Sequence, residues 1–300
     1  MNGLNKVLML TLLSGPALAA TPIATTTKAL DAQGTLEVSN ISGAVTVTAW
    51  DRNEVSYDGS LGDGCELKVT GTADRLTIEV EVKEGGGGGW FGWGSNGPKE
   101  PTTLNIKVPR QASLDLSGVS ASLDVRDLIG SERIEAESVS GNVTVASEAN
   151  AIELSSVSGD VDFRGKTRSA ELGTVSGDIE INEVQGDVSA DSVSGDVLIR
   201  GAAVTRFEGA TVSGDLVLDG SLAANADISM ESVSGGLSLV LPAATSARVS
   251  GESFSGSVNS DFALDIDDEG PGKTFSGSLG AGGGRINLES FSGDVSLRKR

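Results

Sequence analysis

The chain has 300 residues, with 42 acidic and 22 basic side chains, and its formal net charge is −20. Because this charge repels phosphate groups, the composition argues against nucleic acid and anionic membrane surfaces as partners. The sequence contains no histidine, which excludes serine–histidine and cysteine–histidine nucleophile pairs and any metal site that needs an imidazole ligand. Its single cysteine, Cys65, cannot form a disulfide within the chain, and we expect it to be buried as a small apolar side chain.

Residues 1–20 have the features of a secretory signal peptide. Lys6 gives a basic start, an apolar run follows over 7–13, and the small residues of SGPALAA offer a cleavage site after Ala19 or Ala20. No later stretch approaches the ~18 consecutive apolar residues of a membrane-spanning helix. We therefore expect an exported protein of the periplasm or cell surface, with no transmembrane segment.

Residues 21–111 are expected to form an N-terminal β region that includes one coil of the repeat described below. The stretches EVSYDG, CELKVTG, RLTIEVEV and TLNIKVP alternate as strands do, with glycine and aspartate between them. We interpret 51–110 as an antiparallel sheet that covers one end of the repeat stack, because uncovered strand edges promote aggregation.

The same region contains a glycine- and tryptophan-rich segment, 84–98, predicted to be a loop. Five consecutive glycines precede Trp90, Phe91 and Trp93. Glycine-rich segments are flexible, and exposed aromatic rings commonly contact sugars, lipids or a partner. We predict that these three rings bind a ligand or partner. The alternative is that the rings pack against the flank of the fold and the glycines only give slack.

Residues 112–300 are dominated by an internal repeat built around the phrase VSGD. When its glycine is numbered zero, the repeat recurs from Ala121 onward at intervals of 16 to 21 residues. The repeats are centred on Gly43, Ala121, Gly141, Gly159, Gly177, Gly195, Gly214, Gly235, Gly256, Gly277 and Gly293.

Apolar residues occupy fixed positions in this repeat. Positions +2 and +4 are apolar, as in Ile179 and Ile181, and so are most residues at −7 and −5, as in Val188 and Ala190. Position −2 is Val from 139 to 233 and Phe in the last three repeats. Since −2, 0, +2 and +4 follow period two, we expect them to share the inward face of one strand, with a corner near −4. The change from Val to Phe then suggests a wider core near the C-terminal end.

These patterns predict an all-β fold, a single-stack β-solenoid with about 18–21 residues and two strands per coil, preceded by an N-terminal antiparallel β extension. One coil cannot bury its inner face alone, and each inward Val or Ile contributes roughly 1.5–3 kcal/mol once it is buried. We expect 261–272 to be a loop, and we expect Arg298, Lys299 and Arg300 to protect the end of the last coil with charge.

The polar positions have two interpretations. Position −3 is Ser or Thr, position −1 is Ser, and position +1 is Asp in four consecutive coils, at 160, 178, 196 and 215. As outward columns, they would form hydrogen-bonded ladders that stabilise the stack, or a flat face for a repetitive polymer such as a glycan. Stacked aspartates also suit Ca²⁺, but the glycine-rich nonapeptide of calcium β-rolls is absent. We therefore expect no metal and no cofactor.

The segments AVTVTAWDRNEVSYDG and LNIKVPRQASLDLSGVSASLDV, together with the tandem VSGDV coils, resemble a bacterial exported domain family of unknown function labelled "putative adhesin". The resemblance covers about residues 34–300. It implies a β-solenoid in the cell envelope, in some cases linked to envelope stress, with no catalytic residues to transfer.

We therefore predict a non-catalytic, adhesin-like or scaffolding protein, not an enzyme, whose partner is an unidentified envelope component, glycan or protein. The alternative is a carbohydrate-active protein that binds or cleaves glycans on the same scaffold, because glycan-cleaving solenoids use paired carboxylates.

Overall fold

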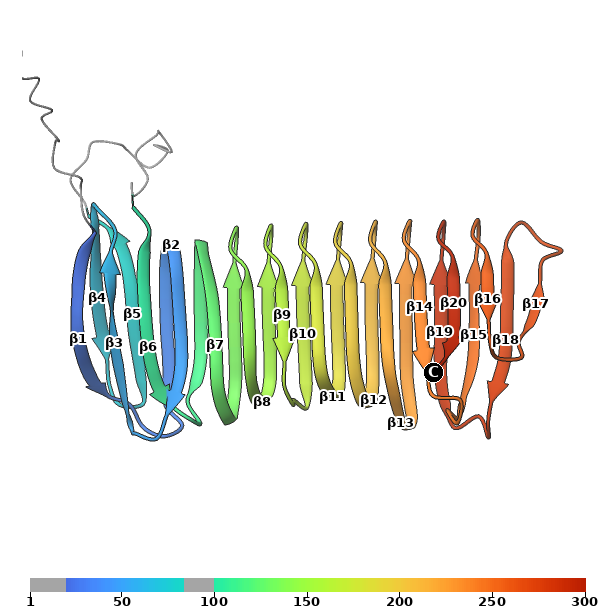
Figure 1. The fold of residues 1–300 in the computed structure, drawn as a ribbon, viewed down its shortest axis with the longest axis horizontal. Coiled ribbons are helices and arrows are strands. Elements are labelled where there is room, and N and C mark those ends of the chain that lie inside the picture. The colour runs from blue at the N-terminus through green and yellow to red at the C-terminus, as the bar shows by residue number, and fades with distance from the viewer. Residues whose placement is uncertain (1–19, 84–99) are drawn as a thin grey trace, which may run out of the picture.

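The computed structural model describes residues 20–83 and 100–300, and its regular elements there are all strands. They join into one continuous sheet that winds into an elongated stack, which confirms the predicted all-β solenoid (Figure 1). The strands are β1 (Thr21–Ala29), β2 (Thr35–Trp50), β3 (Glu54–Leu61), β4 (Cys65–Gly71), β5 (Arg75–Val82), β6 (Thr102–Pro109), β7 (Ser113–Ser138), β8 (Val143–Ser156), β9 (Val161–Arg164), β10 (Ser169–Thr174), β11 (Ile179–Ser192), β12 (Val197–Thr211), β13 (Leu216–Ser232), β14 (Leu237–Leu241), β15 (Ala247–Ser253), β16 (Val258–Ser260), β17 (Asp265–Asp267), β18 (Lys273–Leu279), β19 (Gly284–Ser290) and β20 (Val295–Lys299).

The central part of the molecule, from β7 to β13, is a stack of parallel coils. β11 and β12 pair in parallel, as do β12 and β13, so that Val188, Phe207 and Ile228 lie side by side. Each coil turns sharply at its VSGD phrase and again at a corner on the opposite edge (Figure 1). Equivalent residues of successive repeats therefore form columns that run along the stack.

The apolar columns at +2, +4, −7 and −5 fill the space between the two faces of each coil. Ile179 and Ile181 from one face and Leu172 from the other are all 0–1% exposed. Each coil covers the inner side chains of its neighbour, so burial continues from coil to coil. The sequence prediction for these four positions is confirmed.

The turn itself lies at positions −2 to +1, and the expected corner near −4 is wrong. β8 ends at Ser156 and β9 begins at Val161, so the turn comprises 157–160. Period-two alternation holds within a strand but not across a turn. As a result, −3 points inward and −2 points outward. The predicted inward column at −2 is 44–48% exposed where it is Val. The hydroxyl column at −3, expected to face outward, is 1–6% exposed from Ser138 to Ser290, except for Thr274 of β18, which is exposed.

The buried hydroxyls at −3 bind the glycine N–H of their own turn, and four of them, Ser138, Ser156, Thr174 and Ser253, also bind a neighbouring coil. The Ser156 hydroxyl accepts a hydrogen bond from the Gly159 N–H at 2.9 Å and donates to the Gly141 carbonyl at 3.0 Å. Ser138 makes the same two bonds one coil earlier. A buried hydroxyl needs such partners, and a short side chain fits the narrow space under the turn.

The glycine at position zero is required by space between coils. A Cβ added to Gly159, Gly177 or Gly195 would lie 1.7–2.2 Å from the carbonyl oxygen of the glycine one coil earlier. None of the three has a positive φ, so close approach is the reason. Ala121 is the exception in the repeat, and it pairs with Gly43, whose φ is 114°.

Differences in repeat length are absorbed at the edge opposite the turns. Four non-glycine residues with positive φ lie there, namely Asp127, Glu183, Ala203 and Asn225. The register shifts between β11 and β12 and between β12 and β13 fall in the same corners. The edge that carries the VSGD turns is therefore uniform, whereas the corner edge varies.

At the N-terminal end, the first coil, β2, lies inside the stack. β5 and β6 pair in parallel with its two halves on one side, and β7 pairs with it on the other. β4 is antiparallel to β5, β3 to β6, and β1 to β3, which covers the end. The expected antiparallel sheet over 51–110 is thus only partly right, because β5 and β6 continue the parallel stack. Cys65 is buried as expected, and burial raises the pKa of its thiol.

At the C-terminal end, the last coil of the chain is inserted between two earlier ones. β19 lies between β13 and β15, and β20 between β14 and β16. The stack is closed instead by β18, antiparallel to β15, and by β17, antiparallel to β18. The expectation that Arg298–Arg300 end the stack is therefore wrong. The repeat assigned at Gly277 is also wrong, because Gly277 lies within β18 and not in a turn. The expected loop over 261–272 is irregular apart from the three residues of β17.

Candidate functional site

The uniform edge of the stack carries a continuous row of exposed apolar side chains at position −2. Hydrogen bonds between successive turns establish the order of these side chains; the Ser158 N–H, for example, donates to the Val139 carbonyl. Phe291 and Phe254 come after Val233 in the stack, because β19 pairs with β13 and β15 pairs with β19. Each of the nine side chains is 44–58% exposed. We call this row the turn-edge stripe; in stack order it comprises Val119, Val139, Val157, Val175, Val193, Val212, Val233, Phe291 and Phe254.

A groove of about 760 Å³ runs beside seven of these residues, from Val157 to Phe254. Position −4 forms its other side, where the small residues Ser155, Gly173 and Ala210 leave the half nearest Val157 hollow, with Asp191 between Gly173 and Ala210. At Gly173 there is no atom within 4 Å of where a Cβ would stand. The parallel register stacks the position −4 residues of successive coils into one column, and we call the trough between this column and the stripe the turn-edge groove.

Two phenylalanines form one end of the groove. The rings of Phe254 and Phe291 are stacked, with centroids 5.0 Å apart and planes 5° apart. They are 53% and 58% exposed, so the predicted widening of the core by these rings is wrong. Only the third phenylalanine of that column, Phe275, is buried, because it lies in β18 and not in a turn. The stripe therefore ends in an exposed aromatic pair, which offers a larger apolar contact than Val does.

Four carboxylates of the groove belong to the same −4 column as its small residues. They are Asp191, Glu231, Glu252 and Glu289, and the described residues that line the groove include no lysine or arginine. Burial raises the pKa of Asp191 above its usual value, and the nearby charges of Glu208 and Glu171 add to this effect. The groove is thus apolar along the stripe, and its −4 side is acidic at Asp191 and from Glu231 to the phenylalanine end.

The aspartates at position +1 form a ladder just beyond the turns. The Asp160 carboxylate accepts a hydrogen bond from the Asp178 N–H at 3.1 Å, and the Asp178 carboxylate accepts one from the Asp196 N–H at 2.9 Å. Asp196 and Asp215 continue the pattern toward the next coil. These contacts agree with the interpretation that the column stabilises the stack.

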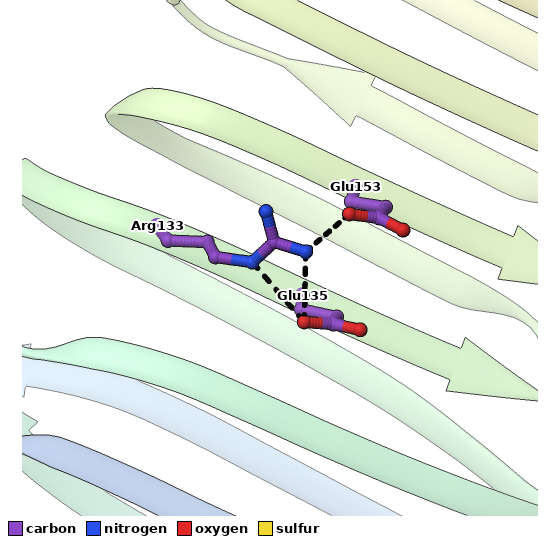
Figure 2. Close-up of polar contacts among 3 residues, drawn as sticks. All are labelled: Arg133, Glu135 and Glu153. Atoms are coloured by element: carbon purple, nitrogen blue, oxygen red, sulfur yellow. Dashed lines mark hydrogen bonds and ion pairs between the residues drawn. The ribbon is translucent and has the colours of Figure 1, made fainter.

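A second acidic cluster lies on β7 and β8. Glu135, Glu137 and Glu153 have carboxylate oxygens within 4.8 Å of one another. Figure 2 shows that the Arg133 guanidinium lies between two of them, donating to Glu135 at 3.0 Å and also to Glu153. This guanidinium already supplies the positive charge that a cation would bring. The cluster therefore gives no reason to change the prediction that the protein binds no metal.

The aromatic residues predicted to bind a ligand, Trp90, Phe91 and Trp93, lie outside the described residues, so their role stays a prediction. The segment that contains them connects β5 to β6. The predicted signal peptide is likewise outside the description, except for residue 20.

The groove is a site that sequence reasoning missed. Position −2 is Val in every repeat from 139 to 233, and its apolar character suggests core. Over the same repeats, however, a core column such as +4 varies among Val, Ile, Leu and Phe. The uniform Val at −2 was therefore the sequence feature that could have identified the exposed stripe.

Comparison with known proteins gives one family and several similar structures. The family model described as Toastrack DUF4097 matches residues 34–298. A "putative adhesin" from Parabacteroides distasonis has a TM-score of 0.52 at 10% identity, over 92% of this chain and 97% of its own. A "putative adhesin" from Parabacteroides merdae has a TM-score of 0.50 at 11% identity, over 92% and 95%. At such identities the likeness shows a shared fold. Among curated proteins none matches this chain. Within the ranges that the structure describes, there is no helix able to cross a membrane.

Proposed function

Given that the chain belongs to the Toastrack DUF4097 family, we propose that it is an exported, non-catalytic binding protein of the cell envelope that holds an elongated partner along the turn-edge groove. The observation that carries this proposal is the unbroken row of nine half-exposed apolar side chains on one edge. Soluble proteins rarely expose large contiguous apolar patches, and such patches commonly mark interaction sites.

An adhesin-like or scaffolding role in the periplasm or at the cell surface fits this geometry. The signal-peptide features of residues 1–20 support export. The names of the two Parabacteroides structures support an adhesive role by fold analogy. A long, straight stack presents many equivalent contacts to an extended partner, which suits attachment or envelope maintenance.

The absence of catalysis is part of the proposal and rests on the state of the acidic groups. The repeat places carboxylates near one another by stacking alone, so their proximity does not indicate a reaction. The +1 aspartates accept backbone hydrogen bonds, and Glu135 and Glu153 are paired with Arg133. Glycan cleavage needs one carboxyl as acid and another as base or nucleophile on either side of a bond. These engaged groups do not offer that pair, and the groove carboxylates lie in one stacked column, so their proximity also follows from the repeat.

Retention on envelope material tests the proposal. The mature chain and a variant with Val157, Val175, Val193 and Val212 changed to Ser are incubated with purified cell envelopes, sedimented and quantified. A variant with Ile129→Ser and Ile266→Ser controls for loss of exposed apolar surface elsewhere, since these residues are 52% and 42% exposed away from the groove. We expect the wild type and the control to sediment and the stripe variant to remain in solution. Equal retention of the stripe variant, or release of soluble sugar products, would contradict the proposal.

A further inference from the structure

The chemistry of the groove narrows the class of partner, and this inference rests on the proposed function. We infer that the turn-edge groove binds an amphipathic α-helix, with the apolar face of the helix on the turn-edge stripe and its lysine or arginine side chains toward the groove carboxylates.

Charge complementarity indicates a basic partner. Asp191, Glu231, Glu252 and Glu289 line the groove, with no basic residue among its described lining. The +1 aspartates add negative charge on the other side of the stripe. A cation in the groove would also meet the exposed carboxylate of Asp191.

The same charges disfavour two other occupants. A second copy of this chain would bring its own acidic groove and a net charge of −20 against the first. A fatty acid or anionic lipid would place its headgroup near four carboxylates. Both arrangements set like charges together in a surface groove, which opposes binding.

The spacing of the stripe favours a helix over an extended peptide. Successive coils repeat about every 4.8 Å along the stack. The apolar side chains on one face of an α-helix recur about every 5.4 Å, whereas those on one face of a β-strand recur about every 6.7 Å. Per coil, the mismatch is therefore about 0.6 Å for a helix and about 1.9 Å for a strand.

The length of the groove fixes the length of the helix. The seven stripe residues from Val157 to Phe254 span six intervals. At about 4.8 Å each, the intervals amount to about 29 Å, the length of a helix of about 19 residues. Such a helix would place five to six turns against the stripe, so its apolar face would be covered from end to end.

Peptide binding tests this inference on the full mature chain. The probe is a fluorescein-labelled peptide of about 19 residues, built from Leu on one face and Lys on the other, and the readout is fluorescence anisotropy. The charge variant carries Asp191→Asn, Glu231→Gln, Glu252→Gln and Glu289→Gln. Its control carries Asp31→Asn, Asp63→Asn, Glu66→Gln and Asp74→Asn, which make the same change in net charge at exposed positions outside the groove.

We expect the wild type and the control variant to bind the Leu–Lys peptide alike. The charge variant and the Val→Ser stripe variant should each bind it at least about tenfold more weakly. A Leu–Glu peptide, and a Leu–Lys peptide with its leucines scattered around the helix, should bind poorly. Circular dichroism and thermal melting establish that each variant is folded.

Three results would overturn the inference. They are equal affinity for the Leu–Glu peptide, equal weakening by the control variant, and stripe-dependent binding to neutral phosphatidylcholine vesicles in place of the peptide. Loss of envelope retention in the stripe variant with no peptide binding would refute the helix and leave the proposed function standing. Peptide binding without envelope retention would refute the proposed function and leave the inferred helix site standing.

Discussion

The glycine at the centre of each turn allows the packing of the coils to be tested with a single methyl group. In Gly177→Ala, the new Cβ would stand 2.1 Å from the carbonyl oxygen of Gly159 and 2.5 Å from its carbonyl carbon. Contacts shorter than 3.0 Å are essentially absent from proteins, so the two turns must separate by about 0.9 Å, the difference between 3.0 and 2.1 Å. Both atoms belong to backbone, so no side-chain rotation can relieve the clash.

The magnitude follows from what this separation disrupts. The Ser176 N–H donates to the Val157 carbonyl at 3.0 Å, and the Asp178 N–H donates to the Asp160 carboxylate at 3.1 Å. A shift of this size takes both beyond hydrogen-bonding distance. Two hydrogen bonds contribute about 0.5–1.5 kcal/mol each, and overpacking costs about 1–3 kcal/mol. We therefore expect Gly177→Ala to lower the free energy of unfolding by about 2–6 kcal/mol.

Gly173 provides the matched control in the same coil. No atom lies within 4 Å of its Cβ position, and its φ is not positive. Gly173→Ala should leave stability unchanged or raise it by up to about 1 kcal/mol, because alanine reduces the entropy of the unfolded chain. Urea unfolding measures both variants, and hydrogen exchange localises the loss to neighbouring coils, since stacked repeats can open separately. An unchanged unfolding midpoint for Gly177→Ala, or equal losses in both variants, would refute this account of the repeat.

Three further predictions concern charge and the undescribed segment. Burial raises the pKa of Asp115, with Glu135 and Glu37 adding to the effect, so its ionised form opposes folding. Asp115→Asn should therefore raise the free energy of unfolding at pH 7, as measured by urea titration. This gain should shrink as the pH falls, and it should vanish below the unfolded pKa of 3.8, where the carboxyl is protonated in both states. Asp178→Ala should lower the melting temperature more than Asp178→Asn, which keeps an acceptor for the Asp196 N–H, and added Ca²⁺ should shift neither the wild type nor the variants. Changing Trp90, Phe91 and Trp93 together to Ala should leave the melting temperature unchanged while reducing envelope retention, and unfolding would contradict a binding role.

The inner columns could be predicted from the sequence because the structure follows strand alternation at these positions. Positions +2, +4, −7 and −5 lie within strands, where alternation determines which face is buried. Ile179, Ile181, Val188 and Ala190 are all buried as predicted. The solenoid followed from those columns, because each needs the next coil to cover it.

The sequence prediction for the turn was wrong because apolar residues keep alternating through the turn in the sequence, whereas the backbone there leaves the extended strand conformation. Val175 stands two residues before Gly177 and looks like the next inward residue of one strand. In the structure, 175–178 turn the chain, and the inward position passes to Thr174. Apolarity alone could not distinguish a buried Val from one exposed for binding, so the groove was missed together with the turn.

The ends of the stack were beyond sequence reasoning for a different reason. The phrase around Gly277 matches the repeat, yet it pairs antiparallel with β15. Which coil neighbours which depends on long-range pairing, and β19 and β20 show that chain order does not determine stack order. The repeat pattern is the same for either arrangement, so the sequence could not distinguish them.

Thiol labelling of the stripe tests most directly whether this edge is exposed and occupied by the partner. Val175→Cys is compared with Ile179→Cys, because these residues are 44% and 1% exposed and Cys65 is buried. Maleimide should modify the cysteine at 175 rapidly and the one at 179 slowly, and cell envelopes or the Leu–Lys peptide should slow modification at 175. Equal rates at the two positions, or a rate at 175 that neither addition changes, would contradict the account.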